Sequence, residues 1–188
     1  PTCAKLYKWS QNGIKVKKIR LDNAGENKLL QKRADSKDWK LGIDFEFTSA
    51  MTPQQNHLAE IAFATLSNRG RAMMYRANIP DKVKPKVCRD AFQTATKLDG
   101  LILITLDGVT KTRYEHWCGQ KPAFAAHLRT WGEAGTVKVK KAPKSEYKGV
   151  TCMMLGYADD HAGDVYRMWD PDTDGVHETR DVTWLKRM

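Results

Sequence analysis

The sequence predicts a mixed α/β part followed by a small all-β part, and three observations support this division. Apolar residues alternate with charged ones over residues 14–21 and 43–48, which is typical of half-buried strands. The polar stretch between them, residues 26–41, predicts a surface helix that ends at Gly42. Beyond residue 149 the β-forming stretches follow one another, at 150–157, 164–170 and 176–184.

A long helix is predicted from about residue 52. Thr52 is a favourable N-cap and Pro53 suits the first helical position, although Asn56 is an alternative cap one turn later. Helical periodicity places Glu60 on the polar side, so we expect Glu60 to face away from the core. The opposite side, which we expect to face the core, carries Leu58, Ile61, Ala62, Thr65, Leu66 and Met73.

The remaining elements are shorter. Residues 87–98 predict a helix, residues 101–106 form an apolar segment, and residues 114–122 predict a short helix that runs into a turn. Residues 170–175 (DPDTDG) have strong hairpin-turn chemistry. The change of character near residues 141–149 indicates the boundary between the α/β part and the all-β part.

Composition favours a polyanionic partner. The chain of 188 residues has a net charge of +10 and 41% hydrophobic residues, enough for one large or two small folded domains. Nucleic acid is favoured over a membrane, because Lys and Arg release counterions from phosphates and no apolar run is long enough to span a bilayer. A merely solubilising surface charge is an equally open explanation. The four scattered cysteines favour a reducing compartment over a zinc or disulfide scaffold.

Asp22 and Glu60 are the candidate catalytic residues. Asp22 follows a predicted strand and Glu60 lies near the start of the predicted long helix. Carboxylates placed in this way can converge on a divalent metal pair, although each alone is more often simply solvated. Residues 1–21 contain no Asp or Glu, and the chain begins with Pro1 and enters structure at once, as we expect of a fragment.

The motifs around these carboxylates resemble the integrase region of copia-type LTR retrotransposon Gag-Pol polyproteins. Residues 20–26 (RLDNAGE) and 52–60 (TPQQNHLAE) are similar to the second half of the integrase catalytic core. Residues 114–122 (YEHWCGQKP), 155–157 (LGY) and 166–171 (YRMWDP) continue the resemblance in the family's order. The resemblance covers nearly the whole chain.

The resemblance implies an RNase H-like integrase core, truncated at its N-terminus, over residues 1–122, and a small SH3-like β-barrel domain over residues 123–188. It implies an Asp–Asp–Glu triad that binds two Mg²⁺ or Mn²⁺ ions, with Asp22 as its second Asp and Glu60 as its Glu. The reaction would be processing of element DNA ends and their transfer into target DNA. The first Asp would precede residue 1, so we expect the isolated chain to be inactive.

The resemblance also suggests residues that contact DNA. Gln54, Gln55 and Asn56 match the segment beside the family's active site, where amides bond to phosphate and sugar oxygens. Independently of the resemblance, Lys138 and Lys140 alternate with apolar residues, which predicts a strand with one apolar and one basic face that is a candidate for DNA contact. A merely solvated strand face is an equally open explanation. A homo-oligomeric full-length protein is expected, with particle assembly in the cytoplasm and integration in the nucleus.

Several residues depart from the family's pattern and suggest a diverged or decaying copy. Arg69 stands where an apolar residue is usual, and Gly70 lies in the middle of the predicted helix. Residues 61–64 replace a basic, polar run, and Glu133 replaces a Cys. Two alternatives to an integrase fragment remain: a non-catalytic nucleic-acid-binding or assembly remnant, and a generic RNase H-like nuclease, which the β-barrel segment disfavours.

Overall fold

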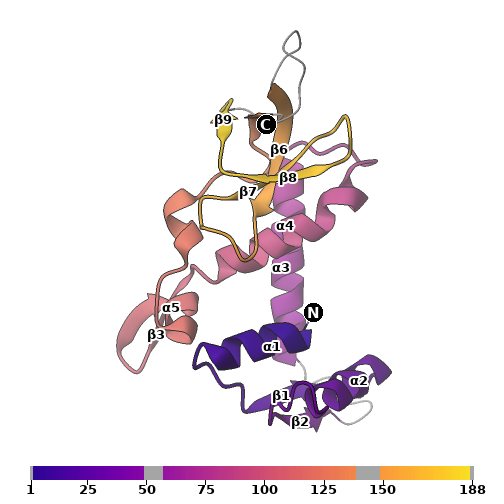
Figure 1. Cartoon of the computed structure of the whole chain (residues 1–188), viewed down its shortest axis with the longest axis vertical. Coiled ribbons are helices and arrows are strands. Elements are labelled where there is room, and N and C mark those ends of the chain that lie inside the picture. Colours follow the sequence, from indigo (N-terminus) through magenta and orange to yellow (C-terminus); the bar gives the residue numbers. More distant parts are fainter. Residues whose placement is uncertain (1, 49–56, 139–148, 187–188) are drawn as a thin grey trace. The chain divides into compact units, whose positions relative to one another are not determined.

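The computed structural model describes residues 2–48, 57–138 and 149–186, and the chain divides into two compact units (Figure 1). We name residues 1–63 the N-terminal unit and residues 64–188 the C-terminal unit. The division falls within helix α3 (His57–Arg76). None of the helices in the described ranges has the length and apolar character that a membrane crossing requires.

A strand–helix–strand segment forms the centre of the N-terminal unit. Strand β1 (Lys18–Leu21) pairs in parallel with β2 (Asp44–Phe47), and α2 (Gly25–Ala34) connects them. Parallel neighbours need such a crossover, because a tight turn can join only antiparallel strands. Helix α1 (Thr2–Gln11) precedes them and buries Cys3 and Leu6. The predicted α/β character of this part of the chain is therefore observed.

Two elements of this unit differ from the prediction. Helix α2 ends at Ala34 rather than at residue 41, because the chain turns back there: the Leu41 N–H donates to the Ala34 carbonyl at 3.1 Å. Lys40 and Gly42 have left-handed φ angles of 41° and 60°, which end any helical continuation. Strand β1 is also shorter than predicted and begins at Lys18. Helix α1 was not predicted from the sequence.

The C-terminal unit combines helices with a five-stranded antiparallel sheet (Figure 1). The hydrogen-bonded strand order is β8-β7-β6-β5-β9. The strands of this sheet are β5 (Ala134–Lys138), β6 (Gly149–Tyr157), β7 (Tyr166–Trp169), β8 (Val176–Thr179) and β9 (Val182–Trp184). The other elements are α4 (Lys84–Asp99), the hairpin β3 (Leu103–Leu106) and β4 (Val109–Thr112), α5 (Arg113–Cys118) and the 3₁₀ helix η2 (Ala123–His127).

Helix α4 and strand β6 form the main core of the C-terminal unit. Val87 and Ala91 of α4 are buried in one cluster with Met154, Leu155 and Met168 of the sheet. Burying side chains of this size contributes about 1.5–3 kcal/mol for each large residue.

Polar contacts also bind α4 to β6. The buried hydroxyl of Thr94 donates to the Leu155 carbonyl at 2.9 Å, and Lys97 Nζ donates to the Tyr157 carbonyl at 2.8 Å. A Cβ at Gly156 would lie 2.7 Å from Thr94 Oγ1, so the helix approaches the strand where a side chain is absent. The sheet and α4 are therefore one packed body.

Helix α3 faces the core differently from the prediction. Its buried residues are Gly70 and Met74, whereas Leu58 is 84% exposed and Ile61 is 49% exposed. A Cβ at Gly70 would lie 2.5 Å from Phe92 Cε1 and closer still to Cδ1, so the second half of α3 packs tightly on α4. The expectation that Leu58 and Ile61 face a core is wrong for this structure, because the burying contacts lie further along the helix.

Two predictions for the β part need correction. Residues 141–149 do not divide two parts of the chain, because β5 and β6 on either side of them pair from Ala134↔Met153 to Lys138↔Gly149. Residues 176–184 form two strands, β8 and β9, rather than one. The apolar segment 101–106, for which no element type is predicted, contains β3 of a hairpin, whose two-residue turn Asp107-Gly108 has positive φ angles at both positions.

The predicted turn at residues 170–175 is confirmed and connects β7 to β8. Buried Asp170 accepts the Asp172 N–H at 2.9 Å and the Thr173 hydroxyl at 2.7 Å. The Thr173 hydrogen bond is the main reason that the pKa of Asp170 lies below its usual value. Asp174 accepts the Trp169 indole N–H at 3.0 Å and pairs with Lys86 of α4 at 2.7 Å, so the turn is also attached to the helix.

Candidate functional site

Asp22 lies immediately after β1, at the carboxyl end of a strand, as predicted. Its side chain is exposed, and its Oδ1 accepts the Ala24 N–H at 3.4 Å and a short bond from the Asn27 amide. The Asn27 amide also donates to the Asp22 carbonyl at 3.3 Å. These bonds hold one carboxylate oxygen against the start of α2, while Oδ2 has no partner among the described residues.

Glu60 lies in the first described turn of α3 and is exposed, in agreement with the expectation that it faces away from the core. Within the described part of the chain, its carboxylate makes neither a hydrogen bond nor an ion pair. A carboxylate near a helix N-terminus is favourably placed with respect to the helix dipole.

Asp22 and Glu60 belong to the same compact unit. The segment that joins β2 to α3 includes residues 49–56, which lie outside the described residues. In the ranges that the structure does describe, no three His, Cys, Asp or Glu side chains are grouped so that they could hold a metal ion. A complete metal site is therefore not assembled by the described residues, and the assignment of Asp22 and Glu60 as catalytic, metal-binding residues stays a prediction.

The predicted DNA contacts are only partly covered by the structure. Gln54, Gln55, Asn56 and Lys140 lie outside the described residues. Lys138 is exposed at the end of β5, while Val137 beside it is 4% exposed and points into the core. The strand therefore has the predicted apolar and basic sides over these two residues.

Part of the positive charge around β1 is neutralised within the protein. Glu46 on β2 pairs with Arg20 at 3.1 Å and with Lys18 at 3.7 Å, on a surface where such pairs contribute little stability. Lys15 and Lys17, just before β1, have no acidic partner within ion-pair distance in the described ranges. The unmatched positive charge therefore lies before the strand rather than along it.

Comparisons with known proteins show what this chain is similar to. Residues 135–188 match the family described as the retroviral polymerase SH3-like domain. The chain is also 29% identical over 180 residues to the retrovirus-related Pol polyprotein from transposon TNT 1-94 of Nicotiana tabacum. The resemblance to a retrotransposon Pol polyprotein is confirmed. The match covers 93% of this chain but only 12% of the tobacco polyprotein, so this chain corresponds to a small segment of that relative.

The family match identifies β5 to β9 as the SH3-like part of this Pol-like segment. A small SH3-like all-β domain at the C-terminal end was predicted, and its class is confirmed. The RNase H-like nature of the preceding residues stays a prediction, as does the domain division at residues 122 and 123. The two compact units divide the chain elsewhere. Helix α4, which the prediction assigns to the integrase core, packs on β6 in one unit with the sheet.

Proposed function

We propose that this Pol-like segment belongs to an integrase, a metal-dependent polynucleotidyl transferase that processes element DNA ends and joins them to target DNA. The supporting observation is the similarity to a retrotransposon Pol polyprotein over 93% of the chain, together with an exposed carboxylate at the end of β1 and another at the start of α3. A Pol polyprotein contains other activities besides the integrase. The assignment to the integrase therefore rests on the two carboxylates, Asp22 and Glu60.

Asp22 and Glu60 are the residues that would hold Mg²⁺ or Mn²⁺. Both side chains are exposed and offer oxygen ligands, which Mg²⁺ prefers, and Asp22 keeps Oδ2 unoccupied within the described residues. A third carboxylate would come from a part of the polyprotein outside this sequence. When bound, the ions would supply activation of the attacking hydroxyl and charge stabilisation at the phosphate. The bonds from Ala24 and Asn27 would fix the orientation of the Asp22 carboxylate.

DNA is the proposed partner, consistent with the net charge of +10. Gln54, Gln55 and Asn56 would contact phosphate and sugar near the carboxylates, and exposed Lys138 with Lys140 would contact phosphates from the SH3-like part. We further propose a homo-oligomeric full-length protein that is assembled in cytoplasmic particles and acts in the nucleus.

A second candidate is a non-catalytic nucleic-acid-binding or assembly remnant. The observation that favours it is the absence of any grouping of three metal-binding side chains in the described part of the chain. This candidate keeps the SH3-like domain and the positive charge but requires no chemistry from Asp22 or Glu60.

The test measures strand transfer by a longer segment of the polyprotein that includes this chain and the predicted first Asp. Asp22→Asn and Glu60→Gln should each abolish strand transfer with Mg²⁺ while DNA binding, measured by anisotropy, is unchanged. Glu26→Gln is the matched control, because Glu26 is also exposed and lies in the first turn of α2. Binding without any strand transfer by the unsubstituted segment would support the remnant, and strand transfer by the isolated 188-residue chain with Mn²⁺ would contradict the incomplete triad.

A further inference from the structure

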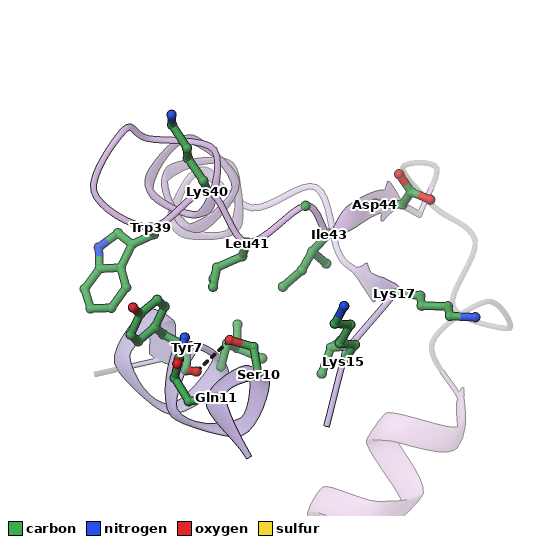
Figure 2. A pocket seen from close by; sticks show the side chains of 13 residues that line it. Tyr7, Ser10, Gln11, Lys15, Lys17, Trp39, Lys40, Leu41, Ile43 and Asp44 are labelled. Carbon is green, nitrogen blue, oxygen red and sulfur yellow. Dashed lines mark hydrogen bonds between the residues drawn. The ribbon is translucent and has the colours of Figure 1, made fainter. Parts of the chain in front are cut away.

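The N-terminal unit contains a cavity that the proposed catalytic residues do not line. It has a volume of about 690 Å³ and lies between α1 and the segment that leads from α2 into β2 (Figure 2). This volume falls within the roughly 300–1,000 Å³ that is typical of small-molecule sites. The cavity is therefore large enough for a ligand of nucleotide size.

One side of the cavity is aromatic and apolar. The rings of Tyr7 and Trp39 meet edge to face, with centroids 5.6 Å apart and an interplanar angle of 72°. Tyr7 is 42% exposed, although packed aromatic side chains are usually covered. Figure 2 shows Leu41 and Ile43 following Trp39 along the wall that faces α1. The exposed part of the Tyr7 ring offers a surface that a flat aromatic group can contact.

Polar and positively charged groups lie elsewhere around the same cavity. Figure 2 shows the Lys15 side chain on the side away from Tyr7 and Trp39, while the side chains of Lys17 and Lys40 extend outward from the rim. Among the described residues that line the cavity, Asp44 is the acidic one. None of the three lysines has an acidic group within ion-pair distance in the described ranges. The cavity therefore separates an aromatic side from a cationic side.

We propose that this cavity binds an unpaired nucleotide of a DNA strand, with the base against Tyr7 and Trp39 and its phosphate at Lys15. An aromatic group joined to an anion matches both sides of the cavity, because bases stack on aromatic side chains and phosphates pair with lysines. A purely apolar ligand would leave the positive charge of Lys15 unmatched. The inference rests on the proposed function only for the source of the strand, which would be a single-stranded overhang at an element DNA end.

The test compares three labelled DNAs by fluorescence anisotropy with the full chain: a duplex with a short overhang, the same duplex with abasic overhang positions, and a blunt duplex. The intact overhang should bind about tenfold more tightly than the abasic one, a typical effect of stacking one base. Trp39→Leu should remove this preference without changing blunt-duplex affinity. Free dAMP at millimolar concentration should compete with the overhang and not with the blunt duplex.

Matched controls separate the cavity from general effects. Trp117→Leu removes an exposed tryptophan of the other unit and Lys28→Gln removes an exposed lysine of α2, so neither should alter the preference. Lys15→Gln, at an exposed position that a glutamine tolerates, should weaken binding of both overhang duplexes relative to the blunt duplex, even if Trp39→Leu destabilises the unit. Equal binding of intact and abasic overhangs would overturn the proposal while leaving DNA binding intact. Competition by an acidic aromatic peptide but not by dAMP would also overturn it, in favour of a protein partner. Failure of all three DNAs to bind would instead refute the proposed function.

Discussion

Replacing Gly70 by Ala tests the close approach of α3 and α4. In an exposed helix interior this change stabilises a protein by about 1 kcal/mol, because Ala has the higher helix propensity. Gly70 is buried, however, and its added methyl group would lie 2.5 Å from Phe92 Cε1, 3.3 Å from Cγ and closest to Cδ1. The structure therefore predicts the opposite sign.

The magnitude follows from the two opposing effects. Forcing an extra methyl group into a packed site costs typically 1–3 kcal/mol, and the overlap with three ring atoms places Gly70 near the upper end of that range. After the gain of about 1 kcal/mol from propensity, a net loss of about 2 kcal/mol remains. For a chain of this length that loss corresponds to a fall of about 4–8 °C in the unfolding midpoint.

Thermal and urea unfolding followed by circular dichroism measure this change. Gly25→Ala is the control, because a Cβ at Gly25 in the first turn of α2 meets nothing within 4 Å, and it should leave stability unchanged or slightly raised. In a double-mutant cycle, Phe92→Ala should offset part of the loss caused by Gly70→Ala, since the two groups collide. A Gly70→Ala protein that is more stable than the parent would refute the close packing of α3 on α4.

Three further predictions concern the C-terminal unit. Thr94→Val should lower the free energy of unfolding by about 1 kcal/mol, because the buried hydroxyl donates at 2.9 Å to a carbonyl of β6 that also receives an indole N–H. Thr96→Val, on the exposed side of α4, should change the same quantity by less than about 0.5 kcal/mol. Urea unfolding measures both changes. The pKa of Asp170 is lowered from 3.8, so its contribution to stability is complete above that pH and is lost as the pH falls through the lower folded-state value. Asp170→Asn should reduce the thermal unfolding midpoint at pH 7 and make that midpoint fall less steeply as the pH is lowered below about 4. An acid profile that the substitution leaves unchanged would contradict this. Burial raises the pKa of the Cys152 thiol to about 11. A thiol reagent at pH 8 should therefore label the half-buried Cys88 and Cys118 first and Cys152 only on unfolding. Rapid labelling of Cys152 in the native protein would show that β6 is not closed over it.

Local signals account for the parts of the fold that the sequence predicted well. Alternation and turn chemistry located β1, β2 and the β7–β8 turn, and the amphipathic period located α4. Each of these elements is specified by side chains that are neighbours along the chain. Helix α1 was not predicted, although Cys3, Leu6 and Tyr7 have the spacing of one face of a helix.

Tertiary packing accounts for the parts that it predicted wrongly. Apolar periodicity in α3 marks Leu58 and Ile61 as candidates for burial. The contact that buries this helix is instead made by Phe92 of α4, which lies against Gly70, more than a turn beyond Ile61 along α3. The basic, Pro-containing stretch after β5 resembles an interdomain linker in composition, yet it connects two strands that pair residue by residue. No local pattern encodes which distant segment will pack on which face.

The candidate functional site was likewise predicted only where local motifs determine it. A motif placed Asp22 at a strand end and Glu60 on the polar side of a helix, and the structure shows both positions. Convergence of the two carboxylates depends on long-range placement that neither motif contains. The nucleotide cavity depends on α1 lying against the segment after α2, so it emerges only from the three-dimensional arrangement.

Two neighbouring residues of α3, Arg69 and Gly70, have structural explanations in the packing of the C-terminal unit. The guanidinium of Arg69 pairs closely with Asp99 at the end of α4, and Asp99 also pairs with Arg113 at 2.5 Å. Gly70, the next residue, provides the space for Phe92. Both residues therefore complete contacts between the same pair of helices, α3 and α4. Arg69 and Gly70 maintain the packing of the C-terminal unit, and neither is a reason to infer that the fold is failing.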